Sequence, residues 1–182
     1  MNPQDEIQRL SGPFPGLKEQ LFTRLEHIPS ASTPAPYLAL LVHQHHMTVT
    51  MEEFYGTPVE VHVLAEHREG DIYSREILLT RSDNQYVIQY GLVRLDLSLI
   101  ERAVSDEILA GREPLGRVLI RHNVLRQLDL TAIVRLQPGP RLRELLGCTA
   151  KTTLYGRFAT IFCSERPAVH VLEIPAPVIE TT

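Results

Sequence analysis

Apolar and polar residues alternate along several segments of this chain, and residues that favour turns separate these segments. A period of two is typical of β-strands, in which successive side chains point to opposite faces. We therefore predict strands at residues 47–51, 59–64, 72–80, 85–95, 128–136, 154–163 and 168–174. Because these short strands follow one another with turns between them, the pattern favours an antiparallel sheet.

Apolar residues at helical spacing occupy other parts of the chain. Leu17, Leu21 and Leu25 fall on one face of residues 15–27, which predicts a helix. Further segments with helical patterns are 98–111, 114–120 (a short helix or turn) and 141–146. Few helices beside many strands predict an α+β protein in which helices cover one face of a sheet.

The pattern fits a single domain over residues 1–182, because this length suits one domain and no linker, repeat or low-complexity tract interrupts it. Residues 1–13 are mostly polar and end in a Gly-Pro pair, so we expect a flexible leader there. Residues 177–182 are expected to form a frayed tail.

Composition narrows the classes of partner. The formal net charge of -4 argues against a nucleic-acid partner, since such domains usually carry a basic excess. No apolar run approaches the roughly 20 residues that span a bilayer, so we expect no integral membrane segment. The polar N-terminus lacks the features of a secretory signal. Cys148 and Cys163 form neither a disulfide framework nor a CxxC metal pair, and we expect reduced thiols in a cytoplasmic protein.

One fixed positive charge, Arg75, interrupts the apolar strand pattern of residues 73–79. A charge removed from water is costly unless it is paired, and the planar fork of arginine suits a carboxylate. Arg75 could lie on a solvent-facing side or strand edge, pair with a carboxylate of the protein, or bind the carboxylate of a small ligand. The strand pattern alone leaves these interpretations open.

A carboxylate, Glu173, ends the last apolar strand pattern. It could form a salt bridge with Arg75, or face a cavity beside it, where burial and a neighbouring arginine would shift its pKa in opposite directions. Gly116, in a Pro-Leu-Gly-Arg turn, allows close backbone approach, and amides at such a turn can bind an anion. Arg157 begins another predicted strand and, taken alone, suits a surface charge.

Three histidines, His43, His45 and His46, stand within four residues. We favour a polar loop over a metal site, because no further Asp, Glu or His ligand recurs at a suitable spacing nearby. The chain also carries no phosphate-binding loop, dinucleotide fingerprint or catalytic-triad motif. We therefore expect a site that needs no metal, nucleotide cofactor or covalent nucleophile.

In combination, several short segments resemble the chorismate pyruvate-lyase family, the cofactor-free 4-hydroxybenzoate synthases, over about residues 15–177. The matching segments, in order, are Thr48–Met51, Arg75–Leu79, Pro114–Arg117, Leu154–Arg157 and Arg166–Pro167 followed by Glu173. The resemblance implies the chorismate lyase/UTRA-like fold. This fold is a single α+β domain whose antiparallel sheet, of six strands or with one more seven, is covered by helical flaps over an enclosed ligand cavity.

The resemblance also implies a function and a set of site residues. Arg75 and the backbone amide of Leu115, next to Gly116, would hold the ring carboxylate of chorismate. Arg157 would hold the enolpyruvyl carboxylate, and Glu173 would orient the hydroxyl or assist proton transfer. The expected reaction is elimination of pyruvate from chorismate to give 4-hydroxybenzoate in quinone biosynthesis, with no cofactor, Arg75 and Glu173 as catalytic residues, and product binding at the same site.

Two alternatives to the chorismate pyruvate-lyase function remain. The same fold includes effector-sensing domains of transcription regulators, so the chain could be a non-catalytic module that binds a small aromatic acid. Such domains normally accompany a helix-turn-helix domain, for which we expect no room in this chain. A lyase acting on a related chorismate-derived substrate is the second alternative. The oligomeric state stays open.

Overall fold

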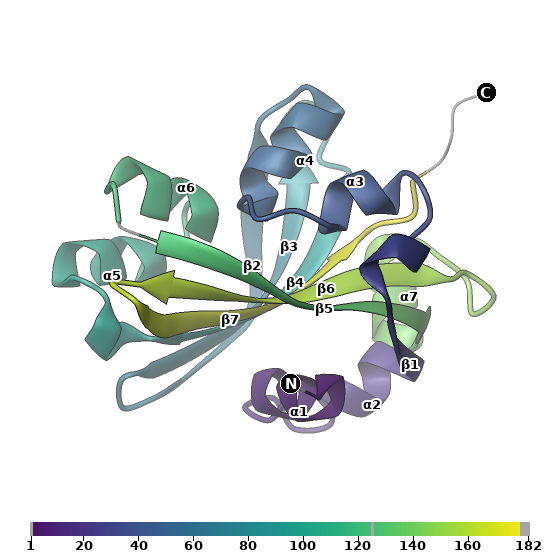
Figure 1. Ribbon diagram of the computed structural model, residues 1–182, viewed down its shortest axis with the longest axis horizontal. Coiled ribbons are helices and arrows are strands. Elements are labelled where there is room, and N and C mark those ends of the chain that lie inside the picture. The colour runs from purple at the N-terminus through teal and green to yellow at the C-terminus, as the bar shows by residue number, and fades with distance from the viewer. Residues whose placement is uncertain (1, 125, 179–182) are drawn as a thin grey trace.

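A seven-stranded antiparallel sheet of order β1-β5-β6-β7-β4-β3-β2 forms the centre of the computed structural model, which describes residues 2–124 and 126–178 (Figure 1). The strands are β1 (Phe22–Ile28), β2 (Val59–Glu69), β3 (Ile72–Arg81), β4 (Val87–Asp96), β5 (Arg126–Pro138), β6 (Leu154–Cys163) and β7 (Arg166–Pro175). The α+β class and the antiparallel sheet are confirmed. The tail predicted to fray lies, at residues 179–182, outside the described residues.

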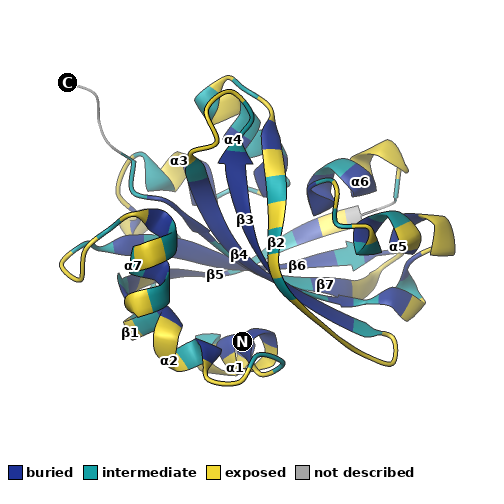
Figure 2. Ribbon diagram, turned by 180° about the vertical axis from the view of Figure 1, so that it is seen from behind, coloured by how far each residue is buried: buried dark blue, intermediate teal, exposed yellow. Residues whose placement is uncertain are grey.

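Helices cover both faces of the sheet, whereas the sequence pattern predicted one covered face. The helices are α1 (Pro3–Ser11), α2 (Leu17–Leu21), α3 (Tyr37–Leu41), α4 (Met47–Tyr55), α5 (Arg102–Leu109), α6 (Leu115–Arg121) and α7 (Pro140–Leu146), with short 3₁₀ turns η1 (Ser30–Ser32) and η2 (Leu97–Leu99). One hydrophobic core joins the sheet to α3, α4, α5 and α6, and a second joins its other face to α1, α2 and α7. Figure 2 shows the central strands as the most buried part of the protein.

Three segments differ from the sequence prediction. Residues 47–51, expected as a strand, form the start of α4, because Met47 and Met51 are four residues apart and both are buried on one helix face. The helix expected over residues 15–27 ends at Leu21, where the backbone of Phe22 becomes extended and β1 pairs with β5. The expected flexible leader forms α1 instead, and its Ile7 is fully buried.

A partly buried ion pair fixes α7 to the sheet on the face opposite Arg75. Glu76 is the neighbour of Arg75 on β3, so its side chain points to the other face. It accepts two hydrogen bonds from Arg141, from Nε at 2.7 Å and from Nη2 at 2.6 Å, and one from the Tyr90 hydroxyl at 2.8 Å. Glu76 is therefore fully occupied and takes no part in balancing the charge of Arg75.

None of the helices within the described ranges is long and apolar enough to cross a membrane.

Candidate functional site

A small cavity lies between the sheet and the helices α4 and α6. Four of the five residues predicted for the site line it: Arg75, Leu115, Gly116 and Glu173. Its volume is about 40 Å³, enough for water but far below the roughly 300 Å³ or more of typical ligand pockets. The structure is therefore a closed form, and a ligand could enter only if the covering helices moved.

Strand register explains why residues far apart in sequence meet at this cavity. Arg75 and Ile77 point to the same face of β3, and Ile77 lies opposite Gly91 on β4. Gly91 in turn lies opposite Glu173 on β7. A Cβ atom at Gly91 would lie 3.1 Å from the Cδ1 atom of Ile77, so the missing side chain keeps the cavity floor open.

Arg75 is buried without a carboxylate partner. Its residue is 1% exposed, its Nη1 donates to the Ile108 carbonyl oxygen at 3.3 Å, and its Nε has no hydrogen-bond partner within the described part of the chain. Glu66 lies opposite Arg75 in the β2–β3 register, yet it accepts a hydrogen bond from the Tyr73 hydroxyl at 2.8 Å and forms no ion pair with Arg75. Burial lowers the pKa of Arg75, and the nearby Tyr73 and Glu66 oppose this shift.

The partial charge of a helix end compensates part of the charge on Arg75. Ile108 is the penultimate residue of α5, so its carbonyl belongs to the negative end of the helix dipole. The hydrogen bond to Ile108 at 3.3 Å and the interaction with the Tyr73 side chain still leave donor capacity of the guanidinium unused, since its Nε has no partner among the described residues. Arg75 therefore combines a buried charge with free donor capacity beside a cavity.

Glu173 pairs with Arg157, not with Arg75. Arg157 is 0% exposed, and its Nε donates to the Glu173 Oε2 at 2.6 Å. The remaining guanidinium nitrogens donate to the carbonyl oxygens of His43 at 3.2 Å and His45 at 3.0 Å. Arg157 does not line the cavity. Its donors hold the segment between α3 and α4 against the sheet.

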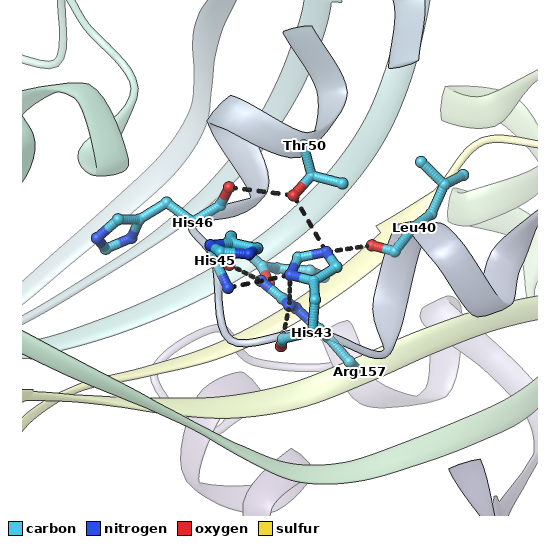
Figure 3. Close-up of polar contacts among 7 residues, drawn as sticks. Leu40, His43, His45, His46, Thr50 and Arg157 are labelled. Atoms are coloured by element: carbon cyan, nitrogen blue, oxygen red, sulfur yellow. Dashed lines mark hydrogen bonds and ion pairs between the residues drawn. The ribbon is translucent and has the colours of Figure 1, made fainter. Parts of the chain in front are cut away.

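His43 lies at the centre of this segment (Figure 3). Its Nε2 lies 2.8 Å from the Leu40 carbonyl oxygen, which can only accept, so Nε2 carries the proton. Its Nδ1 accepts from Arg157 Nη1 and from the His45 backbone N–H, both at 3.1 Å. Burial, followed by the charge of Arg157, lowers the pKa of His43 to about 4. His43 is thus a neutral imidazole that helps to fix the loop.

This hydrogen bonding predicts a pH dependence of stability. Because the pKa of His43 is about 4 in the folded protein and 6.5 ordinarily, the unfolded chain takes up the proton first. Stability should therefore be highest above about pH 6.5 and should fall as the pH decreases towards about 4. Urea unfolding across this range should give a steeper loss for the native protein than for His43→Gln. Equal losses in the two proteins would contradict the assignment.

The segment between α3 and α4 does not form a metal site with its neighbours. Among residues 2–124 and 126–178, no three His, Cys, Asp or Glu side chains are grouped so that they could hold a metal ion. In Figure 3, the His46 side chain points away from His43 and His45. The backbone of this segment matters more, because it accepts two hydrogen bonds from Arg157.

The first turn of α6 closes the cavity. Leu115 and Gly116 begin this helix, so their N–H groups have no acceptor within it. A Cβ atom at Gly116 would lie 2.9 Å from both His46 Cβ and Thr48 Oγ1, which explains the glycine at this contact. An ion pair between Arg117 and Glu52 also links α6 to α4, and about one-third of each of these two side chains is exposed.

Sequence reasoning missed some cavity residues. The family resemblance also implies a ligand contact from a backbone amide of the early loop, near residues 33–36. These residues do not line the cavity, whereas His46, Met47 and Thr48 do. Gln89 on β4 also lines it. A polar residue inside the apolar segment 87–93 was a signal of the same kind as Arg75 and could have identified Gln89.

Comparisons with known proteins establish the fold. No protein-family model and no curated protein sequence matches the chain. PhnF from Mycobacterium smegmatis is similar over 78% of this chain and 71% of its own, with 12% identity and a TM-score of 0.53. The effector domain of PhnF matches 72% of this chain and 88% of its own, with 12% identity and a TM-score of 0.53.

A chain described as the ligand-binding domain of a GntR-family transcriptional regulator from Bordetella bronchiseptica is also similar. It covers 64% of this chain and 85% of its own, with 14% identity and a TM-score of 0.51. At such identities the likeness concerns the fold alone. The predicted UTRA-like fold is confirmed at that level, whereas the resemblance to chorismate lyases in particular is not.

The prediction of a chorismate pyruvate-lyase in quinone biosynthesis is wrong. The similar structures include an effector domain and a ligand-binding domain of a regulator. The physical reason lies in the two residues expected to be catalytic or to bind the second carboxylate. The Nε atom of Arg157 donates to the Oε2 atom of Glu173 at 2.6 Å, and the other guanidinium nitrogens of Arg157 donate to backbone carbonyl oxygens of the protein. The resemblance of short motifs therefore predicted the fold correctly and the enzymatic activity incorrectly. The chain has the fold of the ligand-binding domains of GntR-family regulators.

Proposed function

We propose that this chain is a non-catalytic module that binds a small organic acid in the cavity beside Arg75. The observation that carries the proposal is the state of Arg75, which is 1% exposed, has no carboxylate partner among the described residues and lines the cavity. A buried charge without a counter-ion is costly, so its retention is explained by an anion that binds there. The fold supports a sensing role, because regulator ligand-binding domains share it.

Binding requires an opening of the cavity, and a partly exposed ion pair links α4 and α6, the two helices that cover it. The Arg117–Glu52 ion pair is partly exposed, and pairs of this kind contribute about 1 kcal/mol or less. By contrast, Arg157 holds the segment that precedes α4 through hydrogen bonds to the carbonyl oxygens of His43 and His45. We therefore infer that α6 moves away from α4 when a ligand enters, while the segment around His43 stays in place.

The direct experiment is a calorimetric binding screen of the purified protein with small carboxylates, among them benzoate, 4-hydroxybenzoate and chorismate. We expect at least one acid to bind and to be recovered unchanged. For chorismate, pyruvate is assayed in parallel, and none is expected. Binding of neutral compounds with no acid bound, or release of pyruvate in proportion to the protein added and to time, would contradict the proposal.

A further inference from the structure

A second polar side chain lies on the cavity face of the sheet. Gln89 is 2% exposed and lines the cavity, and its Oε1 is a buried atom that has no hydrogen-bond partner among the described residues. Leaving a buried acceptor unpaired costs about 1–3 kcal/mol. Gln89 therefore resembles Arg75 in one respect: each residue keeps a buried polar atom unpaired beside the same cavity.

Strand register places the two residues at opposite ends of the cavity. Gln89 lies opposite Leu79 on β3, and Arg75 lies four residues before Leu79 on the same strand. Four residues of strand span about 13 Å, and an even separation keeps the side chains on one face. A ligand that contacts both side chains is therefore short, with its polar ends less than about 13 Å apart.

The surface between these two ends is apolar at Ile77, and Gly91, opposite Ile77, leaves space there. Glu173 lies beside Gly91 in the same row and is paired with Arg157, whereas Val93 and Val171 lie level with Arg75. Cavity walls that are mostly apolar, with a few polar groups that fix the orientation, are usual for a site that binds a small molecule. Gln89 is the polar group at the end remote from Arg75.

The charges near Gln89 favour a neutral group. Glu173 lies opposite Gly91, two residues from Gln89, and it already engages Arg157, so a second carboxylate finds no unpaired counter-charge in this ion pair. Its charge is already balanced by Arg157, so an added cation gains little. Rotation of the Gln89 amide by half a turn exchanges the positions of its acceptor oxygen and its donor nitrogen. A hydroxyl group can bond to the oxygen or to the nitrogen, since it both donates and accepts hydrogen bonds.

We propose that Gln89 is the specificity-determining residue of the cavity and that it selects acids carrying a neutral hydroxyl at the end remote from the carboxylate. This proposal rests on the proposed function of the cavity as an acid-binding site. It adds a requirement that acid binding alone does not impose: the ligand must carry a hydrogen-bond donor at the end remote from its carboxylate.

Matched pairs of acids test it: benzoate with 4-hydroxybenzoate, and hexanoate with 6-hydroxyhexanoate. For the native protein, we expect the hydroxylated member of at least one pair to bind about tenfold more tightly, because one buried hydrogen bond is gained. In Gln89→Leu this preference should fall to about twofold or less, while the affinity for the unsubstituted acid stays the same or rises. Gln89→Met is measured in parallel, so that the result does not depend on the folding of one variant.

The outcomes separate this proposal from the proposed function. Acids that bind the native protein with no preference for a hydroxyl would overturn the role of Gln89 and leave the acid site standing. A preference that persists in both Gln89 variants would do the same. If no acid binds the native protein, both proposals fail. Gln127→Leu serves as the control, because this amide lies on β5, exposed and outside the cavity, and should leave all affinities unchanged.

Discussion

Arg75→Met is expected to weaken acid binding strongly and, at the same time, to stabilise the ligand-free protein. Loss of the guanidinium removes the charge that binds the anion, and truncating one side of a buried charge pair costs about 2–5 kcal/mol. An acid that binds the native protein should therefore bind the variant about 100-fold more weakly or worse. The free energy of unfolding should rise by about 1 kcal/mol, because a buried charge that is only partly compensated is replaced by an apolar side chain of similar length.

Calorimetric titration and urea unfolding measure the two effects separately. Arg81→Met is the matched control, since Arg81 lies on the same strand, outside the cavity, and is paired with Asp83 near the surface. We expect this control to change stability by less than about 1 kcal/mol and to leave binding unchanged. A strong destabilisation by Arg75→Met would mean that Arg75 has a structural partner and is not kept for a ligand.

Arg157→Met should have the opposite effect on stability. Removing this side chain leaves Glu173 without its partner and frees the His43 and His45 carbonyl oxygens from their hydrogen bonds. Breaking a buried ion pair from one side typically costs about 3–5 kcal/mol, and the partial exposure of Glu173 places the expected loss near the lower value. Urea unfolding gives the free energy directly.

A second variant checks the cause of this loss. In the double variant Arg157→Met with Glu173→Leu, the orphaned carboxylate is gone, so part of the stability should return. Arg135→Met is the control: Arg135 pairs with Glu26 at the surface and should contribute less than about 1 kcal/mol. If the double variant is no more stable than Arg157→Met alone, the ion pair is not the source of the effect.

The sequence made the strands of the sheet predictable, because alternation of apolar and polar residues is a local signal. It did not distinguish α4 from a strand. Thr48, Val49 and Thr50 favour a strand by their branched side chains, yet burial of Met47 and Met51 in the core makes this segment helical. The same uncertainty hid β1, whose pairing with β5 depends on residues more than a hundred positions away.

The sequence identified the charged residues of the candidate site, but it did not identify their ion-pair partners. Arg75 was recognisable as a charge in an apolar strand, and Glu173 as a carboxylate in another. Which arginine meets Glu173 depends on strand order, which places Arg157 directly opposite it. That pairing is invisible in a linear sequence, and it engages both residues with each other in the ligand-free protein.

The most direct test of the central claim compares an acid with its own amide. Benzoate and benzamide, or 4-hydroxybenzoate and 4-hydroxybenzamide, have nearly the same shape and differ in charge. For the native protein we expect the acid to bind about 100-fold more tightly than the amide, and for Arg75→Met the two should bind within about threefold of each other. Equal affinity of the native protein for acid and amide would contradict the claim that the unpaired, buried Arg75 is kept to bind an anion.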